Sequence, residues 1–337
     1  MVDVYAGQHR LSSGVACGDR AMLSSTTRPH HGGMINVEHL TKRYGAQLAV
    51  DDVSFHCERG SITGFLGPNG AGKSTTLRMT TGLTPPTGGR VTIDGRRFVD
   101  LPNPGRLVGV MLDAAAQHAG RTGLETLKLS AQLLDLPARR AVEMLEAVGL
   151  ADAGGRRVGN YSLGMRQRLG IASALMGDPA VLILDEPANG MDPEGIRWMR
   201  LLLRDFANRG GTVLLSSHLL GEVQATVDRL VVIGRGRIVA DAQLDALLAG
   251  QGTVVRGLDQ PALVAALQAA GCAVRTTDGD AVRVDAPAEQ VGRIALAAGQ
   301  VLLELREGGD GLEDLFFELT SSGATSHSSD SAAAVAA

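Results

Sequence analysis

Hydrophobic residues along the middle of the chain fall into two kinds of pattern. The segments 180–185, 212–217 and 229–234 are apolar at most successive positions, which is typical of strands buried on both faces of a parallel sheet. A shorter segment, 91–94, also has the composition of a strand. From about residue 120 to 177 the apolar residues instead recur every three or four positions, as they do along one face of a helix. The pattern predicts an α/β domain that contains a mainly helical part.

A second, smaller unit is predicted after Leu248. Strand-like segments begin at 253, 273, 281 and 301, and amphipathic helices are expected at 260–270 and 287–298. This βαββαβ order is that of the split-βαβ, ferredoxin-like arrangement, and Asp278-Gly279 is a suitable turn for its central hairpin. A further helix at 312–319 is expected to pack on one of the two units.

These patterns divide the chain into four parts. Residues 1–33 lack periodicity and residues 321–337 are rich in Ser and Ala, so both ends are predicted to be disordered. Residues 34–248 form the predicted main domain, whose helical subdomain covers about 120–177. Residues 249–320 form a predicted accessory α+β domain.

The composition limits the possible partners. The 337 residues are enough for about two domains, and the 44% hydrophobic content predicts a globular protein. Lys and Arg together number 32, against 36 Asp and Glu. Because there is no basic excess of the kind that drives binding to a phosphate backbone, no nucleic-acid partner is expected.

Cysteine usage and hydropathy both point to the cytosol. Cys17, Cys57 and Cys272 are too far apart for a metal site or a disulfide framework, which suits a reducing compartment. No apolar run approaches the roughly 18 residues of a spanning helix, and no signal peptide is recognisable at the start. A role at a membrane would therefore depend on a partner.

The clearest chemical motif is a glycine-rich loop at 67–74. Its sequence follows a strand-like segment and precedes a helix-like one, which is the setting of the phosphate-binding P-loop, or Walker A motif. Backbone N–H groups and the helix N-terminus surround phosphate oxygens in such a loop. Lys73 is expected to reach the β- and γ-phosphates, and Ser74 to ligate Mg²⁺. The predicted nucleotide-binding residues are Gly67, Pro68, Asn69, Gly70, Ala71, Gly72, Lys73, Ser74 and Thr75.

Two adjacent carboxylates, Asp185 and Glu186, follow the apolar run at 180–185. Ligands of parallel α/β folds collect where strands leave the sheet in this way. Asp185 suits the coordination shell of Mg²⁺, and Glu186, which should point to a different side, is expected to act as the base for an attacking water. Taken alone, the pair could equally be a solvated strand end. The P-loop upstream favours a hydrolytic site.

Further motifs indicate a family. The segments YSLGMRQRLGIA (161–172), NGMDP (189–193) and SSH (216–218) occur in this order around the carboxylate pair, and KRYG (42–45) precedes the P-loop. Together they resemble the nucleotide-binding subunits of ABC transporters over about residues 35–248. The resemblance implies a P-loop NTPase fold with a mixed sheet and a helical subdomain.

The resemblance also implies residue roles. Tyr44 would stack on adenine, Ser162 and Gly164 would belong to the signature loop, Asp192 to the D-loop, and His218 would be the switch histidine that faces the γ-phosphate. A helix N-terminus such as the one predicted at Ser162 favours an anion. In this family the signature serves the nucleotide of a second copy, which implies two ATP molecules sandwiched in a head-to-tail dimer. From the residues alone, Ser162 could be an ordinary N-cap, and Tyr44 and His218 could be core residues.

Two regions depart from the family pattern. In the signature, Leu163 replaces a glycine and Met165 a glutamine, a change that could alter hydrolysis. In the Q-loop, Asp113 stands where glutamine is expected, and Gln117 follows four residues later. One interpretation is that a buried Asp113 carboxylate beside the phosphates ligates Mg²⁺. The other is that Asp113 only contacts the permease.

These inferences predict a cytosolic ATPase subunit that dimerises around two MgATP and drives a separate membrane-spanning permease at the cytoplasmic face of the membrane. The single cassette, the SLGM signature and the C-terminal unit are similar to ATP-binding subunits of bacterial drug, antibiotic or lipid exporters of the daunorubicin-resistance type. The accessory domain is expected to be regulatory or dimer-supporting, or alternatively a packing appendage.

Two other functions remain as alternatives. One is an ABC ATPase that acts on ribosomes or DNA, and the other is a metabolic P-loop kinase. The sequence has one P-loop and no sustained heptads of the kind that a long coiled coil needs. A kinase would have no use for the signature motif, so transport is the favoured interpretation.

Overall fold

The computed structural model describes residues 34–307, apart from 219–220, 222–223, 250–251 and 277–279. The two ends that were predicted to be disordered, 1–33 and 321–337, lie outside these residues. The predicted helix at 312–319 and the Asp278-Gly279 turn also lie outside them.

A six-stranded sheet forms the centre of the larger domain, in the order β5-β6-β7-β3-β8-β9. Its strands are β3 (Ile62–Leu66), β5 (Val108–Met111), β6 (Val181–Asp185), β7 (Thr212–Ser217), β8 (Arg229–Gly234) and β9 (Arg237–Gln243). All neighbouring pairs are parallel except β8 and β9, which are antiparallel. The three long apolar runs of the sequence are β6, β7 and β8, and every residue of β7 is buried. The predicted mixed sheet with buried parallel strands is therefore confirmed.

A separate antiparallel sheet packs nearby, in the order β2-β1-β4. It contains β1 (Ile35–Tyr44), β2 (Gln47–Cys57) and β4 (Gly88–Ile93). Residues 91–93 of the predicted strand-like segment form the end of β4, and Asp94 follows in a turn, so the segment belongs to this sheet and not to the parallel one. Its alternation of exposed and buried residues is typical of a sheet with one face on the core.

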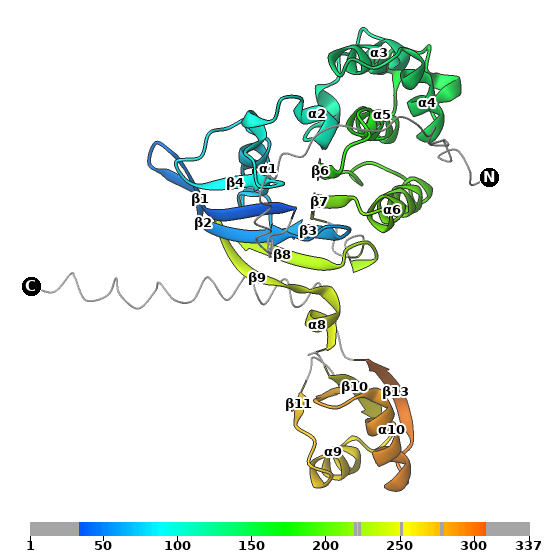
Figure 1. Cartoon of the computed structure of the whole chain (residues 1–337). Coiled ribbons are helices and arrows are strands. Elements are labelled where there is room, and N and C mark those ends of the chain that lie inside the picture. Colours follow the sequence, from blue (N-terminus) through cyan, green and yellow to red (C-terminus); the bar gives the residue numbers. More distant parts are fainter. Residues whose placement is uncertain (1–33, 219–220, 222–223, 250–251, 277–279, 308–337) are drawn as a thin grey trace, which may run out of the picture.

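Helix α1 (Lys73–Thr80) lies between the two sheets (Figure 1). Its Leu77 and Met79 belong to the same buried cluster as Val37 of β1 and Ile183 of β6. The helix that begins at the P-loop lysine is therefore anchored from both sides, which fixes the loop in front of it.

The predicted helical part, 120–177, contains α3 (Gly123–Leu133), α4 (Arg139–Ala147) and α5 (Leu163–Leu175). These helices cluster beyond the β5–β6 side of the sheet (Figure 1). Helix α3 starts with a capping box, in which the Thr122 hydroxyl accepts the Glu125 backbone N–H at 3.1 Å and the Glu125 carboxylate accepts the Thr122 N–H at 2.8 Å. A longer helix, α6 (Pro193–Asn208), follows the loop after β6. The short helices are η1 (Phe98–Asp100), α2 (Pro104–Leu107), η2 (Ala114–Ala116), η3 (Ala151–Ala153), η4 (Val158–Asn160) and α8 (Leu244–Ala249).

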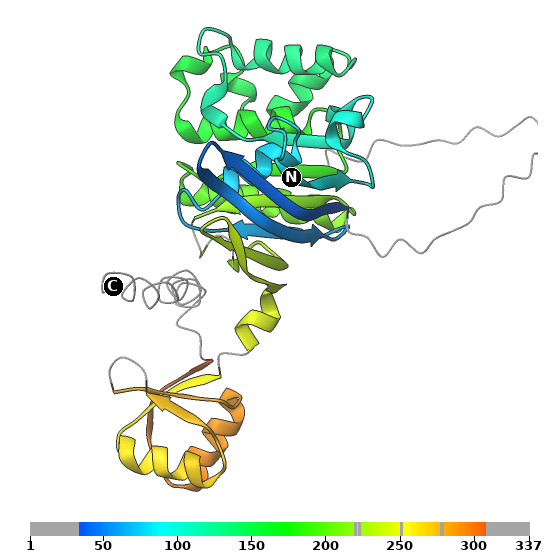
Figure 2. The same cartoon turned by 90° about the vertical axis from the view of Figure 1, so that its left-hand side faces the viewer.

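The C-terminal unit follows α8. It consists of β10 (Thr253–Gly257), α9 (Gln260–Ala269), β11 (Val274–Thr276), β12 (Val282–Val284), α10 (Ala288–Ala297) and β13 (Leu302–Glu307). The four strands form an antiparallel sheet in the order β11-β12-β10-β13. Both helices pack on one face of this sheet (Figure 2). The predicted ferredoxin-like order is therefore confirmed.

Candidate functional site

Three neighbouring parallel strands bring the chemical motifs to one edge of the central sheet. Strands β6, β7 and β3 are adjacent, and their carboxyl ends lead into Glu186, His218 and the P-loop. Because parallel strands end at the same edge, motifs that are far apart in the sequence meet there.

The P-loop requires glycine at two positions. Gly72, the residue before α1, has φ 110°, and a Cβ there would lie 2.7 Å from the carbonyl oxygen of Ala49. A Cβ on Gly67 would lie 2.4 Å from the carbonyl oxygen of Ile233. On this side the loop therefore runs so close to the neighbouring backbone that a side chain would not fit. Its other side is open for a ligand.

A cavity of about 380 Å³ lies in front of this loop. It is lined by Tyr44, Gln47, Ala49, Pro68, Asn69, Gly70, Gly72, Lys73, Ser74, Thr75 and Glu186. Tyr44 ends β1 with 49% of its surface exposed, so it is not a core residue. The structure therefore brings together the P-loop, Tyr44 and Glu186, as the sequence predicts.

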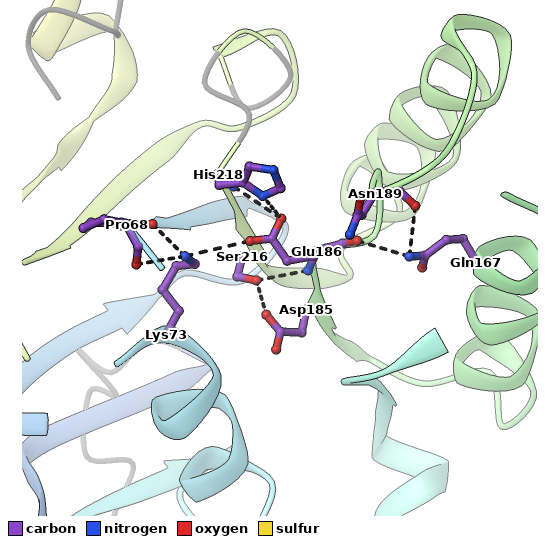
Figure 3. A network of polar contacts seen from close by, with 9 residues as sticks. Pro68, Lys73, Gln167, Asp185, Glu186, Asn189, Ser216 and His218 are labelled. Carbon is purple, nitrogen blue, oxygen red and sulfur yellow. Dashed lines mark hydrogen bonds and ion pairs between the residues drawn. The ribbon is translucent and has the colours of Figure 1, made fainter. Parts of the chain in front are cut away.

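Lys73 is buried at the start of α1, and its ammonium contacts the P-loop itself. Nζ donates to the carbonyl oxygens of Gly67 at 2.6 Å and Pro68 at 3.4 Å, and lies 3.8 Å from Oε1 of Glu186 (Figure 3). Burial lowers the pKa of Lys73 below the usual lysine value, while the carboxylates of Glu186 and Asp185 act in the opposite direction.

Asp185 and Glu186 point to different sides, as predicted (Figure 3). The Ser216 hydroxyl of β7 donates to Oδ1 of Asp185 and accepts the backbone N–H of Glu186 at 3.1 Å. Glu186 has φ 50°, a left-handed conformation that is unusual for a residue with a side chain. This backbone turn separates the two adjacent carboxylates.

His218 follows β7 and contacts Glu186. Its Nδ1 lies 2.7 Å from Oε2 of Glu186, and its backbone N–H donates to the same oxygen at 3.3 Å. The ring is 43% exposed, so His218 is not a core histidine. Glu186 thus lies between a lysine and a histidine at the edge of the cavity.

The signature residues lie at the start of α5. Ser162 is its N-cap, and its hydroxyl accepts the backbone N–H of Met165 at 3.2 Å. Asp192 is the N-cap of α6, and its Oδ1 accepts the backbone N–H of Gly195 at 2.8 Å. The residues that line the P-loop cavity do not include Ser162, Gly164 or Asp192.

The expectation that Asp113 is buried is wrong. Asp113 is exposed in the short segment between β5 and η2, and it is not among the residues around the cavity. The reason is local: in the segment between β5 and the short helix η2 it is the neighbouring Ala114 that packs into the core, and Asp113 is left on the surface. Gln117, four residues later, instead donates from Nε2 to the carbonyl oxygen of Arg166 on α5 at 3.0 Å.

Comparison with known proteins identifies the family of this site. A family profile described as "ABC transporter" matches residues 50–189. The bacitracin transport ATP-binding protein BcrA of Bacillus licheniformis is 42% identical over 217 residues, which cover 64% of this chain and 71% of that protein. The chain belongs to the ABC transporter ATP-binding proteins.

Two further matches extend this assignment of the ABC ATPase. The daunorubicin resistance ATP-binding protein DrrA3 of Streptomyces coeruleorubidus is 37% identical over 292 residues, 83% of this chain and 90% of that protein. A dimeric ATP-binding cassette, solved in a post-hydrolysis state with ADP and Pi, is 25% identical with a TM-score of 0.57, and the match covers 63% of this chain and 99% of that one. The predicted family, fold class and ATPase activity are confirmed, and a transport role is favoured over one on ribosomes or DNA. No helix in the described part of the ABC ATPase is long and apolar enough to span a bilayer.

One residue at this site was not predicted from the sequence. Gln167 of α5 is buried, and its Nε2 donates to the carbonyl oxygens of Glu186 at 3.4 Å and Asn189 at 3.2 Å (Figure 3). The sequence does contain a signal for this contact, because Gln167 is a polar residue on the same, buried face of α5 as Gly164 and Ile171. A long polar side chain on the apolar face of a helix needs a partner, and here the partner is the loop that follows β6.

Proposed function

We propose that this ABC ATPase hydrolyses MgATP in a head-to-tail dimer and drives a separate membrane permease at the cytoplasmic face of the membrane. The observation that carries the proposal is the position of Glu186, whose carboxylate faces both Lys73 and His218 beside the P-loop cavity. A carboxylate next to a phosphate-binding lysine can orient and deprotonate the water that attacks the γ-phosphate. His218 would then steady Glu186 and reach the γ-phosphate.

The cavity supports nucleotide binding by Tyr44 and the P-loop residues 67–75. Lys73 would exchange the carbonyl oxygens of Gly67 and Pro68 for phosphate oxygens, which are better partners for an ammonium because they are charged. The half-exposed ring of Tyr44 offers a face on which adenine can stack.

Oxygen donors at the site fit Mg²⁺. Ser74 lines the cavity with a hydroxyl, and the Asp185 carboxylate is oriented by the hydroxyl of Ser216. Hard oxygen donors of this kind suit Mg²⁺. When bound, the ion would neutralise charge on the β- and γ-phosphates.

The second copy would complete each nucleotide site. Ser162 and Gly164 lie at the N-terminus of α5 and away from the P-loop cavity of their own chain. Helix N-termini favour anions, so these residues suit the γ-phosphate held by a partner. Asp192, at the N-terminus of α6, would lie at the same interface.

The finer assignments rest on the relatives. Because BcrA is named for bacitracin transport and DrrA3 for daunorubicin resistance, we propose a drug, antibiotic or lipid as the exported substrate. We also propose residues 34–248 as the ATP-binding domain, and residues 249–320 as a domain that regulates the ATPase or supports its dimer. Asp113, exposed and outside the cavity, is proposed to contact the permease and not the metal.

Reconstitution tests the transport role. The full chain is combined in vesicles with candidate permeases, which are polytopic membrane proteins from the same organism, and ATP hydrolysis and uptake of a labelled antibiotic into inside-out vesicles are measured. We expect the permease to stimulate hydrolysis and to support ATP-dependent uptake. Stimulation by ribosomes or DNA, with none by any membrane protein, would instead support the alternative function.

A further inference from the structure

Gln167 connects the signature helix to the loop that carries Glu186. It lies in the second turn of α5, after Ser162 and Gly164, and its Nε2 donates to the carbonyl oxygens of Glu186 at 3.4 Å and Asn189 at 3.2 Å. These two acceptors are the ends of the first turn after β6, in which the Asn189 N–H also donates to the Glu186 carbonyl oxygen at 3.1 Å. One side chain of the helical subdomain therefore spans the turn that begins at the proposed base (Figure 3).

Packing alone does not account for a glutamine here. Gln167 is only 5% exposed, and its Oε1 is buried without a hydrogen-bond donor among the residues that the structure describes. A buried amide oxygen that lacks a hydrogen-bond donor destabilises the fold, so an apolar side chain of similar length would avoid this penalty. What glutamine provides at this position, and an apolar side chain does not, is an amide N–H group that donates hydrogen bonds to the turn.

The backbone of Glu186 depends on contacts at both of its ends. Its φ of 50° is in the left-handed region, where a residue with a side chain is strained and persists only when its surroundings enforce the conformation. The Ser216 hydroxyl accepts its N–H at 3.1 Å, and Gln167 donates to its carbonyl oxygen. This conformation directs the carboxylate away from Asp185 and toward Lys73 and His218.

The first turn of α5 touches the same loop at a second point. A Cβ on Gly190 would lie only 2.2 Å from Cδ2 of Leu163, and a Cβ on Gly164 would lie 3.3 Å from the carbonyl oxygen of Gly190. The start of α5 and the loop 186–191 are therefore in contact at two places. A displacement of the signature helix would be transmitted to the Glu186 backbone through these contacts.

We propose that Gln167 is a positioning residue that holds Glu186 in its hydrolytic orientation and links it to the signature helix. This inference rests on the proposed function, in which Glu186 is the base. It implies that Gln167 acts on the hydrolytic step and contributes little to ATP binding, because its amide contacts the backbone of the turn and not the cavity.

The test compares Gln167→Leu and Gln167→Glu with Ser173→Ala in the full chain. Ser173 lies on the same helix, and its hydroxyl is 2.9 Å from that of Ser130, so Ser173→Ala removes a polar contact of α5 away from the loop. A misplacement of about 1 Å can lower a rate by about 100-fold, so we expect both Gln167 variants to lose about 10- to 100-fold in kcat with KM for ATP changed less than about twofold. Ser173→Ala should keep the wild-type kcat.

A second measurement separates positioning from a general structural role. Gln167→Leu is combined with Glu186→Gln, and ATP-dependent dimerisation is measured by gel filtration with MgATP. We expect the double variant to dimerise as Glu186→Gln alone does, because the carboxylate that Gln167 positions is already removed. Loss of ATP binding or dimerisation in this background, or a Gln167→Leu kcat equal to the wild type, would overturn the inference. If Glu186→Gln alone hydrolysed ATP at the wild-type rate, the assignment of the base would fail instead.

Discussion

Lys73 and Glu186 form an ion pair in the lining of the P-loop cavity, with Nζ of Lys73 3.8 Å from Oε1 of Glu186. Lys73 begins α1 and Glu186 follows β6, so the pair joins motifs more than a hundred residues apart in the sequence. The same ammonium also donates to the carbonyl oxygen of Gly67 at 2.6 Å. Phosphate groups therefore have to compete with protein oxygens for Lys73, and they place negative charge beside the carboxylate of Glu186.

Replacement of Lys73 should weaken nucleotide binding. A hydrogen bond to a charged group contributes about 1.5–3 kcal/mol, so we expect Lys73→Ala to raise the Kd for MgATP by about 10- to 100-fold and to abolish turnover. Isothermal titration with MgATP measures the binding. Lys128→Ala, which removes an exposed lysine on α3, should bind as the wild type does. Equal affinity of Lys73→Ala and Lys128→Ala would contradict the assigned role.

Mixed dimers test whether the signature serves the partner's nucleotide. Mixing Ser162→Arg with Lys73→Ala chains gives dimers in which one site carries both changes and the other site carries neither. We expect partial recovery of ATP hydrolysis relative to either variant alone, measured over a range of mixing ratios.

The matched control for Ser162→Arg is Thr122→Ala. It removes another N-cap hydroxyl of the helical subdomain, away from the signature. Loss of such a cap costs about 1 kcal/mol of stability, so Thr122→Ala should retain most hydrolysis on its own. Absence of recovery at every ratio, with Thr122→Ala active, would argue against sites shared between two chains.

Asp113 should be dispensable for metal binding. Its side chain is exposed and not among the residues around the cavity, so we expect Asp113→Ala to leave the Mg²⁺ concentration for half-maximal hydrolysis unchanged in the isolated subunit. Transport in reconstituted vesicles should fall. If Asp113→Ala needed more Mg²⁺ for half-maximal hydrolysis and Asp113→Gln needed only the wild-type concentration, Asp113 would instead be assigned to the metal site.

The sequence predicted the strands of the site better than the contacts between them. Continuous apolar runs reveal buried strands such as β6 and β7, and a residue that directly follows such a strand, such as Glu186, lies at the ligand-binding edge whatever the exact packing. The exposure of Asp113 could not be predicted in this way, because it depends on which residue between β5 and η2 packs into the core. The contact of Gln167 with the Glu186 carbonyl oxygen depends on how the helical subdomain packs against the sheet, which no local pattern specifies.

The Cys57 thiol should be unreactive in the folded protein. Burial raises its pKa to about 12. The thiolate is the reactive form, so at pH 8 we expect iodoacetamide to label Cys57 only after denaturation, as measured by peptide mass spectrometry. Rapid labelling of the native protein at pH 8 would contradict this expectation.

Because the pKa of Cys57 is raised in the folded protein, the contribution of this thiol to stability is complete below the pKa that the thiol has in the unfolded chain. The contribution is lost as the pH rises toward about 12.

The central claim is that Glu186 is the base of an ABC ATPase. Its most direct test is phosphate release by Glu186→Gln, measured beside its affinity for MgATP. The amide cannot accept a proton from water, and loss of a general base typically costs about 100- to 10,000-fold in rate. We therefore predict that Glu186→Gln binds MgATP within a few-fold of the wild type and releases phosphate at least about 100-fold more slowly. Phosphate release at the wild-type rate, with binding intact, would contradict the account.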